Sequence, residues 1–275
     1  GLSGTVLRRV KWLEDGITLD GARVNVRVRV KEGQTLAVRL TDPAPPSEPV
    51  PIEGPLDIVY EDADLVVLNK APSVLVHPSH GHFYDTLGNF LMYHYKQLND
   101  GSGFHPVHRL DKGTSGLLVV AKHAHGQEKL KNQLHTGDFR RVYLAVCDGR
   151  PPALTGVIAA PIGPVDSSPV ARAVRPDGKP ARTCYQLLRR WGPRSLVCLE
   201  LKTGRTHQIR VHMAHIGCPL TGDFLYGTEN QFLIPRPALH SAYLELRHPI
   251  TGERLVFAAP LPDDIQDLKP KEDIS

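Results

Sequence analysis

Hydrophobic and polar positions divide the chain into two unequal stretches. From Leu56 onward, short apolar runs recur between turn residues, as in LDIVYEDADLVVLNK, where two runs flank an Asp-containing turn. Such runs predict strands and hairpins. The same pattern occurs in SGLLVVAK, RRVYLAVCDG, ARTCYQLLRR, SLVCLELKTG and HSAYLELRHPITGERLVFAAP. Together these segments predict an α+β domain with a mixed or antiparallel β-sheet.

Helical patterns are fewer than strand patterns. They occur in DTLGNFLMYHY (residues 85–95), HGQEKLKNQLHTG (125–137) and THQIRVHMAHIG (206–217). The second and third segments each end at a glycine, which is typical of a helix C-cap. Thr206 is the expected N-cap of the third helix.

The first part of the chain, residues 7–40, predicts a small separate α+β unit. Its apolar positions predict the end of a helix followed by short β runs, with a tight turn at Asp20-Gly21. In NVRVRV, residues 25–30, apolar and polar positions alternate, which predicts a half-buried strand with both arginines on one face. Such a face suits RNA, and it also suits a solvated strand edge.

Proline density marks the boundary between the two stretches. The segment TDPAPPSEPVPIEGP has no periodicity, and proline fixes φ and removes a backbone donor. We therefore expect an extended, semi-rigid linker. The C-terminal segment DDIQDLKPKEDIS is charged, and we expect it to be frayed. The predicted division is an N-terminal α+β unit (1–42), a linker (43–55), a main domain (56–264) and a charged tail (265–275).

Composition narrows the class of protein. Of the 275 residues, 41% are hydrophobic, which supplies a core and excludes a disordered chain. The net charge of +4 favours a polyanionic partner without requiring one. No apolar run approaches the ~18 residues of a membrane helix, and no secretory leader is evident. These features predict a cytoplasmic protein, which we expect to be a monomer.

The metal-binding residue types do not form a recognisable site. The four cysteines lack the close spacing of a zinc site and predict reduced, mostly buried thiols. His212 and His215 could share a helix face, but no acidic residue accompanies them in a ligand pattern. RNA contacts or a satisfied helix surface therefore explain them better than a metal, and we expect no metal. No glycine-rich motif that would cradle a nucleotide cofactor is present either.

The most informative segment is HPVHRLDKGTSGLLVVAK, residues 105–122. Asp111 lies between an apolar leucine and a turn-like KGTSG, directly before a strong strand. A carboxylate at the mouth of a strand, beside an arginine, is placed to take part in chemistry or simply to cap the turn. The spacing alone leaves both interpretations open.

The pattern H-R-L-D-x-x-T-S-G, followed by an apolar strand, resembles the signature of the RluA-type pseudouridine synthases. RRVYLAV, DGKPARTCYQLL, LKTGRTHQIRVHMAHIGCPLTGDFLYG and LHSAYLELRHPITGERLVFAAPLP resemble further blocks of that family, in the family's order. The likeness covers residues 56–262. Residues 7–40 are similar to the alpha-L RNA-binding domain that often precedes the catalytic domain, with a shortened first helix.

The resemblance implies an enzyme that isomerises specific uridines of a structured RNA to pseudouridine by base flipping. Large-subunit ribosomal RNA is favoured over transfer RNA by the alpha-L-like segment. Asp111 would be the essential carboxylate, acting on carbon 1′ of the ribose or on the base. Arg205 would keep it ionised in a dry pocket, and Tyr143 would stack on the flipped uracil. The isomerisation needs no cofactor, because no redox change occurs and no group is lost.

The resemblance also implies supporting roles for other residues. Arg109 would enter the RNA stack in place of the flipped base, His108 and Thr114 would position the loop, and Leu220 would line the base pocket. The unstacking energy would come from phosphate contacts. Candidates for these contacts are Arg140, Arg141, Arg210, Lys129 and Lys131, some of which would be ordinary solvated charges.

Two other functions are compatible with parts of the pattern. A non-catalytic RNA-binding protein could keep the fold, although binding alone does not need Asp111, Tyr143 and Arg205 together. A nucleoside or glycoside hydrolase would require two carboxylates near one bond, and Asp223 is the weaker second candidate.

Overall fold

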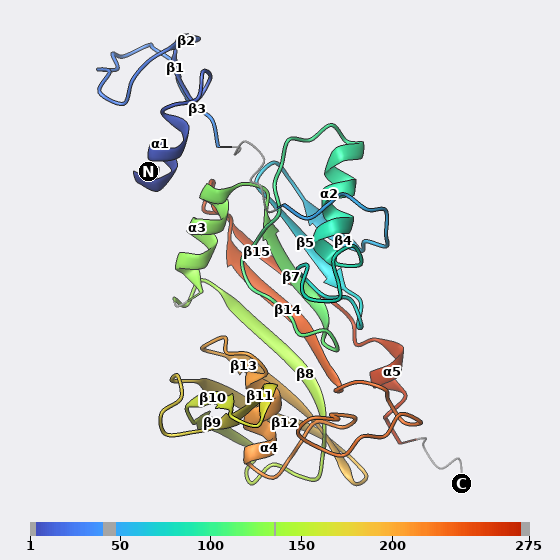
Figure 1. Ribbon diagram of the computed structural model, residues 1–275. Helices are drawn as coiled ribbons and strands as arrows, with labels where there is room; N and C mark the ends of the chain where they lie inside the picture. The colour runs from blue at the N-terminus through green and yellow to red at the C-terminus, as the bar shows by residue number, and fades with distance from the viewer. Residues whose placement is uncertain (1–3, 41–47, 135, 271–275) are drawn as a thin grey trace.

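A ten-stranded mixed sheet forms the body of the protein (Figure 1). The computed structural model describes residues 4–40, 48–134 and 136–270. In chain order, the strands of this sheet are β4 (Ile58–Glu61), β5 (Leu65–Lys70), β6 (His105–Pro106), β7 (Ser115–Ala121), β8 (Arg140–Asp148), β9 (Thr155–Ala159), β12 (Arg182–Trp191), β13 (Arg194–Leu201), β14 (Leu239–Arg247) and β15 (Arg254–Ala258). They pair in the order β4-β5-β7-β14-β8-β13-β12-β9, with β15 beside β14 and β6 beside β7. The predicted α+β class with a mixed sheet is confirmed.

Helices pack on both faces of the sheet. The helices of the main domain are α2 (Leu87–Gln97), α3 (Ala124–Gln133), α4 (Gln208–His215) and α5 (Asp263–Gln266). Side chains of α2 and α4 share one core with Val66 and Leu68 of β5, whereas α3 packs on the opposite face against Leu65 and Val67. Successive side chains of a strand point to opposite faces, so β5 is buried on both sides and reads as a continuous apolar run. The three helices expected within residues 85–217 are confirmed, with shifted ends.

The junction between β7 and β14 is the one parallel pairing described in this sheet. Ser241 of β14 lies opposite Gly116 of β7 and also opposite Tyr143 of β8. A Cβ added at Gly116, whose φ is 106°, would lie 2.3 Å from the Ser241 carbonyl oxygen. Only glycine permits this approach. The start of β7 is thereby held one strand away from Tyr143.

The N-terminal unit contains a β-hairpin whose turn is formed by two residues with positive φ. Its elements are α1 (Gly4–Val10), β1 (Ile17–Leu19), β2 (Ala22–Arg23) and β3 (Leu36–Val38), and the strands form a separate sheet in the order β2-β1-β3. The predicted turn is confirmed at Asp20 and Gly21, where φ is 51° and 82°. These angles match a type I′ turn, which explains the Asp-Gly pair.

The strand predicted at residues 25–30 is wrong. The Asn25 side chain accepts a hydrogen bond from the Arg27 amide (2.8 Å), and the Val28 amide donates to the Asn25 carbonyl (3.1 Å). The hydrogen bonds of Asn25 thus stabilise a turn, which competes with the strand-to-strand hydrogen bonds of a sheet. The alternating Val26 and Val30 are exposed rather than half-buried, so no apolar face stabilises a strand here.

Part of the predicted linker lies against α2. The Val50 carbonyl accepts a hydrogen bond from the Asn89 side chain (2.8 Å), and the Ile52 amide donates to the Asn89 carbonyl (3.1 Å). Residues 48–55 are thus attached to the main domain. The first part of the linker, residues 41–47, lies outside the described residues.

The prediction of a frayed tail is wrong for residues 263–270. Ile265 and Leu268 are almost completely buried, packed in one cluster with Val146 and Trp191. Apolar residues three positions apart share one side of a helical turn, and here that side meets the core while the charged neighbours face solvent. Residues 271–275 lie outside the described residues.

Buried histidines contribute to the core and not to a metal site. Both ring nitrogens of His212 are engaged, Nδ1 with the Thr183 hydroxyl (2.8 Å) and Nε2 with the Ala160 carbonyl (2.9 Å), whereas His215 is exposed. Burial lowers the pKa of His212 below its ordinary value.

Among the described residues, no helix has both the length and the apolar character needed to cross a bilayer.

Replacing Ile265 by alanine should lower the free energy of unfolding by about 2–4 kcal/mol, because it removes buried methylene groups and leaves a cavity. Urea unfolding followed by circular dichroism measures this change. The control is Ile250→Ala, which truncates an exposed isoleucine and should change stability by less than ~0.5 kcal/mol. Equal effects of the two variants would contradict the anchored tail.

Stability should fall when the pH is lowered from about 7.5 to 5.5. Burial lowers the pKa of His108, His212 and His240 in the folded protein, whereas in the unfolded chain these side chains titrate near ~6.5. Below that pH the unfolded chain binds more protons, so acidification favours unfolding. Urea unfolding at several pH values measures how steeply the free energy of unfolding changes with pH. This slope should be smaller in His212→Gln. An unchanged slope in that variant would contradict the assignment.

Candidate active site

A tight turn positions Asp111 at the entrance to β7. The Thr114 amide donates to the Asp111 carbonyl (3.0 Å), and the Thr114 side chain is buried. From the neighbouring loop, the Ser73 amide and the Lys70 ammonium both donate to the Lys112 carbonyl, at 2.8 and 3.2 Å. The turn is therefore fixed from both sides, with the Asp111 side chain 22% exposed.

Lys70 is an unusual buried cation next to this turn. It is 1% exposed, and its ammonium also donates to the carbonyls of Ala71 (2.8 Å) and Val74 (2.9 Å). Burial lowers the pKa of Lys70 to about 7, with a further contribution from the charge of Arg236. Sequence analysis did not single out Lys70, since an isolated lysine after a strand gives no indication of burial.

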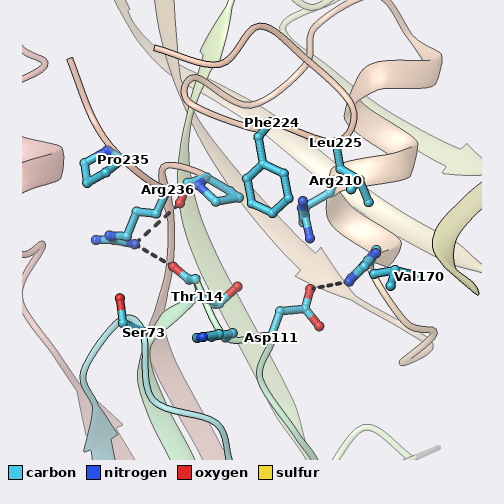
Figure 2. Close-up of a pocket in the computed structure, with 13 residues that line it drawn as sticks. Ser73, Asp111, Thr114, Val170, Arg210, Phe224, Leu225, Pro235 and Arg236 are labelled. Atoms are coloured by element: carbon cyan, nitrogen blue, oxygen red, sulfur yellow. Dashed lines mark hydrogen bonds and ion pairs between the residues drawn. The ribbon is translucent and has the colours of Figure 1, made fainter. Parts of the chain in front are cut away.

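Cavities on two sides of Asp111 give its carboxylate access to ligands. The first, about 390 Å³, opens between Asp111, Phe224 and Arg236 (Figure 2). The second, about 290 Å³, is lined by Tyr143 and by charged residues that include Arg205. A smaller space of about 50 Å³ shares Asp111 with both cavities. It is lined by six predicted site residues, which are Arg109, Asp111, Thr114, Tyr143, Arg205 and Arg210.

Tyr143 is largely enclosed on β8. Its side chain is 3% exposed and packs in the core shared with α2 and α4. Burial raises the pKa of Tyr143, so the phenol stays protonated near neutral pH. The ring is thus available for stacking and the hydroxyl for donating a hydrogen bond.

The direct ion pair expected between Arg205 and Asp111 is absent. The Arg205 Nε atom donates to the Pro180 carbonyl (3.0 Å), and among the described residues the one ion-pair partner within 4.0 Å of the Asp111 carboxylate is His207. The N-cap residue of α4 is His207, whereas the sequence predicted Thr206. Arg205 therefore lies three residues before the helix, and it lines the cavities without contacting the carboxylate.

Arg210, which was predicted to contact an RNA phosphate, is a buried cation close to Asp111 and is paired within the protein. Its Nε and Nη2 atoms donate to both oxygens of Asp223, each at 2.7 Å, and both residues are at most 5% exposed. Burial lowers the pKa of Arg210, but the charges of Asp223 and Asp111 raise it more. The Asp223 carboxylate also accepts from the amides of Leu225 and Tyr226.

His207 has a backbone conformation that the sequence did not reveal. It is left-handed, with φ 56° and ψ 20°. Its Nδ1 atom lies 2.8 Å from the Tyr226 hydroxyl, and its Nε2 atom lies 4.0 Å from the Asp111 carboxylate. Burial lowers the pKa of His207, against the opposing charge of Asp111. Histidine is among the residues that tolerate this region, but no local pattern predicts it.

Arg236 ties the Asp111 turn to the C-terminal segment. Its Nη1 atom donates to the Gly113 carbonyl (3.0 Å), while Nε and Nη2 donate to Asp264 at 2.6 and 2.7 Å. No spacing rule connects residues this far apart in sequence, so this contact was missed.

Leu220 does not line a cavity beside Asp111. It is completely buried in the core and forms an isolated bridge with Cys147, so its predicted place in the base pocket stays a prediction. Arg140 is 45% exposed and lies near Glu200 (3.5 Å) and Glu245 (3.6 Å).

One group of side chains has the composition of a metal site. Asp62, Asp64 and His248 place one ligand atom each within 4.8 Å of one another. However, His248 Nδ1 accepts from the Ile250 and Thr251 amides, which leaves Nε2–H to donate to Asp62 (2.9 Å). The cluster is an ion-paired network, and this network satisfies its polar atoms without an ion.

Breaking the Arg210–Asp223 pair should strongly destabilise the protein. Arg210→Met leaves a buried, unpaired carboxylate and should lower the free energy of unfolding by about 3–5 kcal/mol. Urea unfolding measures the loss, and Arg210→Met/Asp223→Leu should recover part of it. The exposed Arg175, which pairs with Asp166 and Asp177, serves as the control, and Arg175→Met should have little effect.

Comparisons with known proteins agree with this geometry. Residues 64–215 match the family model of RNA pseudouridylate synthases. The chain is 39% identical over 268 residues to the uncharacterized RNA pseudouridine synthase YjbO of Bacillus subtilis, covering 98% of this chain and 94% of that protein. It is 40% identical to the ribosomal large subunit pseudouridine synthase D of Pseudomonas aeruginosa, covering 94% and 84% of the two chains.

A solved structure has the same fold. Human RNA pseudouridylate synthase domain containing 1 superposes with a TM-score of 0.62 at 28% identity, covering 75% of this chain and 83% of that one. The matched region contains the Asp111 turn, Tyr143 and the start of α4. With the similarity extending over nearly the whole chain, this protein belongs to the RluA-type family of RNA pseudouridine synthases.

Proposed function

We propose that the protein isomerises specific uridines of large-subunit ribosomal RNA to pseudouridine, with Asp111 as the essential carboxylate. The observation that carries this proposal is a partly exposed carboxylate on a fixed turn, shared by cavities that also contain Tyr143 and several arginines. The ribosomal substrate is suggested by the Pseudomonas aeruginosa relative, which is named for the large ribosomal subunit. Such a substrate also implies a cytoplasmic enzyme.

The chemistry requires one bond to break and another to form. The N1–C1′ bond of the uridine breaks, the uracil rotates, and C5 bonds to C1′ while the C5 proton leaves and N1 regains a proton. Asp111 acts on C1′ or on the base. Both routes need an ionised carboxylate, and the positive charge of Arg210 close by stabilises it in a partly dry cavity.

The remaining residues bind and hold the extruded nucleotide. The Tyr143 ring stacks on the uracil, and its hydroxyl, which burial keeps protonated, can donate a hydrogen bond to the base. The exposed Arg109, on the extended segment before Asp111, enters the gap left in the RNA stack. Arg205 lines the cavity that faces the RNA backbone. A single chain provides all of these residues, which supports action as a monomer.

Hydrolysis of a glycosidic bond is the weaker alternative. Canonical glycosidases place two carboxyl groups beside one bond. Asp223 has both oxygens occupied by Arg210 and by two backbone amides, and it is 0% exposed. Such a carboxylate cannot readily exchange protons with a substrate, which supports isomerisation.

The test uses large-subunit ribosomal RNA transcribed with tritium at C5 of uridine. The wild-type protein should release tritium while the RNA chain stays intact. Asp111→Asn should reduce the rate by roughly 10³-fold or more, as loss of a nucleophile or base does, with RNA binding in a gel-shift assay largely kept. The control, Asp138→Asn, removes an exposed carboxylate paired with Arg247 and should react at the wild-type rate.

Other outcomes would separate the alternatives. Release of free uracil would indicate a hydrolase, and binding without tritium release would indicate an RNA-binding protein that has lost catalysis. Mapping pseudouridines in ribosomal RNA from a deletion strain would then identify the modified position.

A further inference from the structure

One buried arginine lacks the partners that the other buried arginines have. Arg141, Arg210 and Arg236 are 6%, 4% and 5% exposed. Arg210 is paired with Asp223, and Arg236 with Asp264 and three carbonyls. For Arg141, no hydrogen bond or ion pair exists with any part of the chain that the structure describes.

The surroundings of Arg141 do not compensate its charge. Its guanidinium carbon lies 5.7 Å from the centre of the Phe139 ring, and its Nε atom is buried without a partner. A guanidinium cannot release its proton in a protein. A buried, unpaired charge is strongly unfavourable, and an exception of this kind in a native protein calls for an explanation, of which a bound ion is one.

A second unsatisfied donor lies close to the same guanidinium. His108 Nε2 accepts from the Val119 amide (3.4 Å), so the hydrogen is on Nδ1, which is buried and has no partner. Burial and the charge of Arg141 lower the pKa of His108 well below its ordinary value, so the ring is neutral. Neutral His108 thus offers an N–H group without placing a second positive charge beside Arg141.

Both donors line the 290 Å³ cavity on the Tyr143 side of Asp111. Its walls carry three arginines, Arg109, Arg141 and Arg205, and the single carboxylate of Asp111. The cavity therefore has an excess of positive charge, which a recessed site concentrates. A Cβ added at Gly204 would lie 3.3 Å from Arg141 Nη1, so glycine leaves the guanidinium room.

Building on the proposed function, we infer that this cavity binds one phosphodiester of the RNA, next to the extruded uridine, with Arg141 as its buried cation. A phosphate oxygen pair matches the planar fork of a guanidinium, and the N–H of His108 provides a further donor. The site adjoins Asp111, where the ribose must lie, so the adjacent backbone phosphate falls within the cavity. Binding removes the unfavourable burial of Arg141 and thereby helps to offset the unstacking of the base.

The first test uses inorganic sulfate and needs no RNA. Thermal unfolding is measured in sodium sulfate and in sodium chloride of equal ionic strength, for wild type, Arg141→Met and Arg254→Met. Arg254 is exposed and paired with Glu245, so its variant is the matched control. At sulfate about ten times its Kd, the rise in Tm should be about 3 °C larger in wild type and Arg254→Met than in Arg141→Met.

The same samples distinguish a binding residue from a structural one. In chloride, Arg141→Met should unfold at the wild-type Tm or above it, since it removes an uncompensated charge. A lower Tm in chloride, as expected for Arg210→Met, would assign Arg141 to the structure and overturn the inference. An equal sulfate response in wild type and Arg141→Met would overturn it as well.

The second test uses the large-subunit ribosomal RNA transcript. The dependence of log Kd on log salt is measured by fluorescence anisotropy between 50 and 200 mM KCl, as an order-of-magnitude range over which phosphate contacts weaken. Arg141→Met should raise Kd about 10-fold and reduce the slope by about 0.7 to 0.9, the contribution of one phosphate. Arg254→Met should match wild type, and an unchanged slope in Arg141→Met would contradict the inference.

Failure of the inference and failure of the proposed function give different results. If wild type releases tritium from the RNA but Arg141→Met keeps the wild-type salt slope, the enzyme assignment stands and the phosphate site does not. If the sulfate response depends on Arg141 but no tritium is released, the anion site stands and the isomerase assignment fails.

Discussion

The close approach of β7 to β14 is the constraint on which the active site depends. Because the position facing Ser241 has no side chain, β7 begins directly beside β14, which pairs on its other edge with the strand that carries Tyr143. Asp111 is then set by the turn that leads into β7. Strand pairing thus brings two residues that are distant in sequence to one site, and hydrogen bonds from Lys70, Ser73 and Arg236 hold the turn that carries Asp111.

Charge at the site is decided by pairing and not by composition. The net charge of +4 is small for an RNA-binding protein. Arg210 and Arg236 are ion-paired inside the protein, with Asp223 and Asp264, so neither guanidinium is free to pair with an RNA phosphate. The arginines of the second cavity form no such ion pair with any residue that the structure describes, and Asp111 is the one carboxylate that lines the cavity with them, so a local excess of positive charge remains that suits a polyanion.

Much of the fold follows from local patterns, and less of the site does. The apolar runs of the strands, the glycine that follows α4 and the Asp20-Gly21 turn each depend on a few adjacent residues, and each was predicted, whereas α3 ends at Gln133, before the glycine expected to cap it. The strand expected at residues 25–30 failed because Asn25 forms a turn that alternation cannot reveal. Helix α4 starts two residues later than Thr206 because His207 adopts a left-handed conformation.

Errors in the site arose where the role of a charge depends on tertiary partners. The sequence indicated that Asp111 needs a cation but pointed to Arg205, since the Arg210–Asp223 pair has no signature in spacing. Leu220 lies in a motif beside the site, yet a core position and a pocket position have the same apolar composition. The resemblance to a family identified the segment correctly, but the contacts of each side chain within it became clear only from the three-dimensional structure.

The bonds made by Arg236 connect the Asp111 turn, through Asp264, to a helix near the end of the described chain. During translation, the turn emerges from the ribosome long before its partner does. The reactive loop therefore cannot reach its final arrangement until residue 264 has been made and docked.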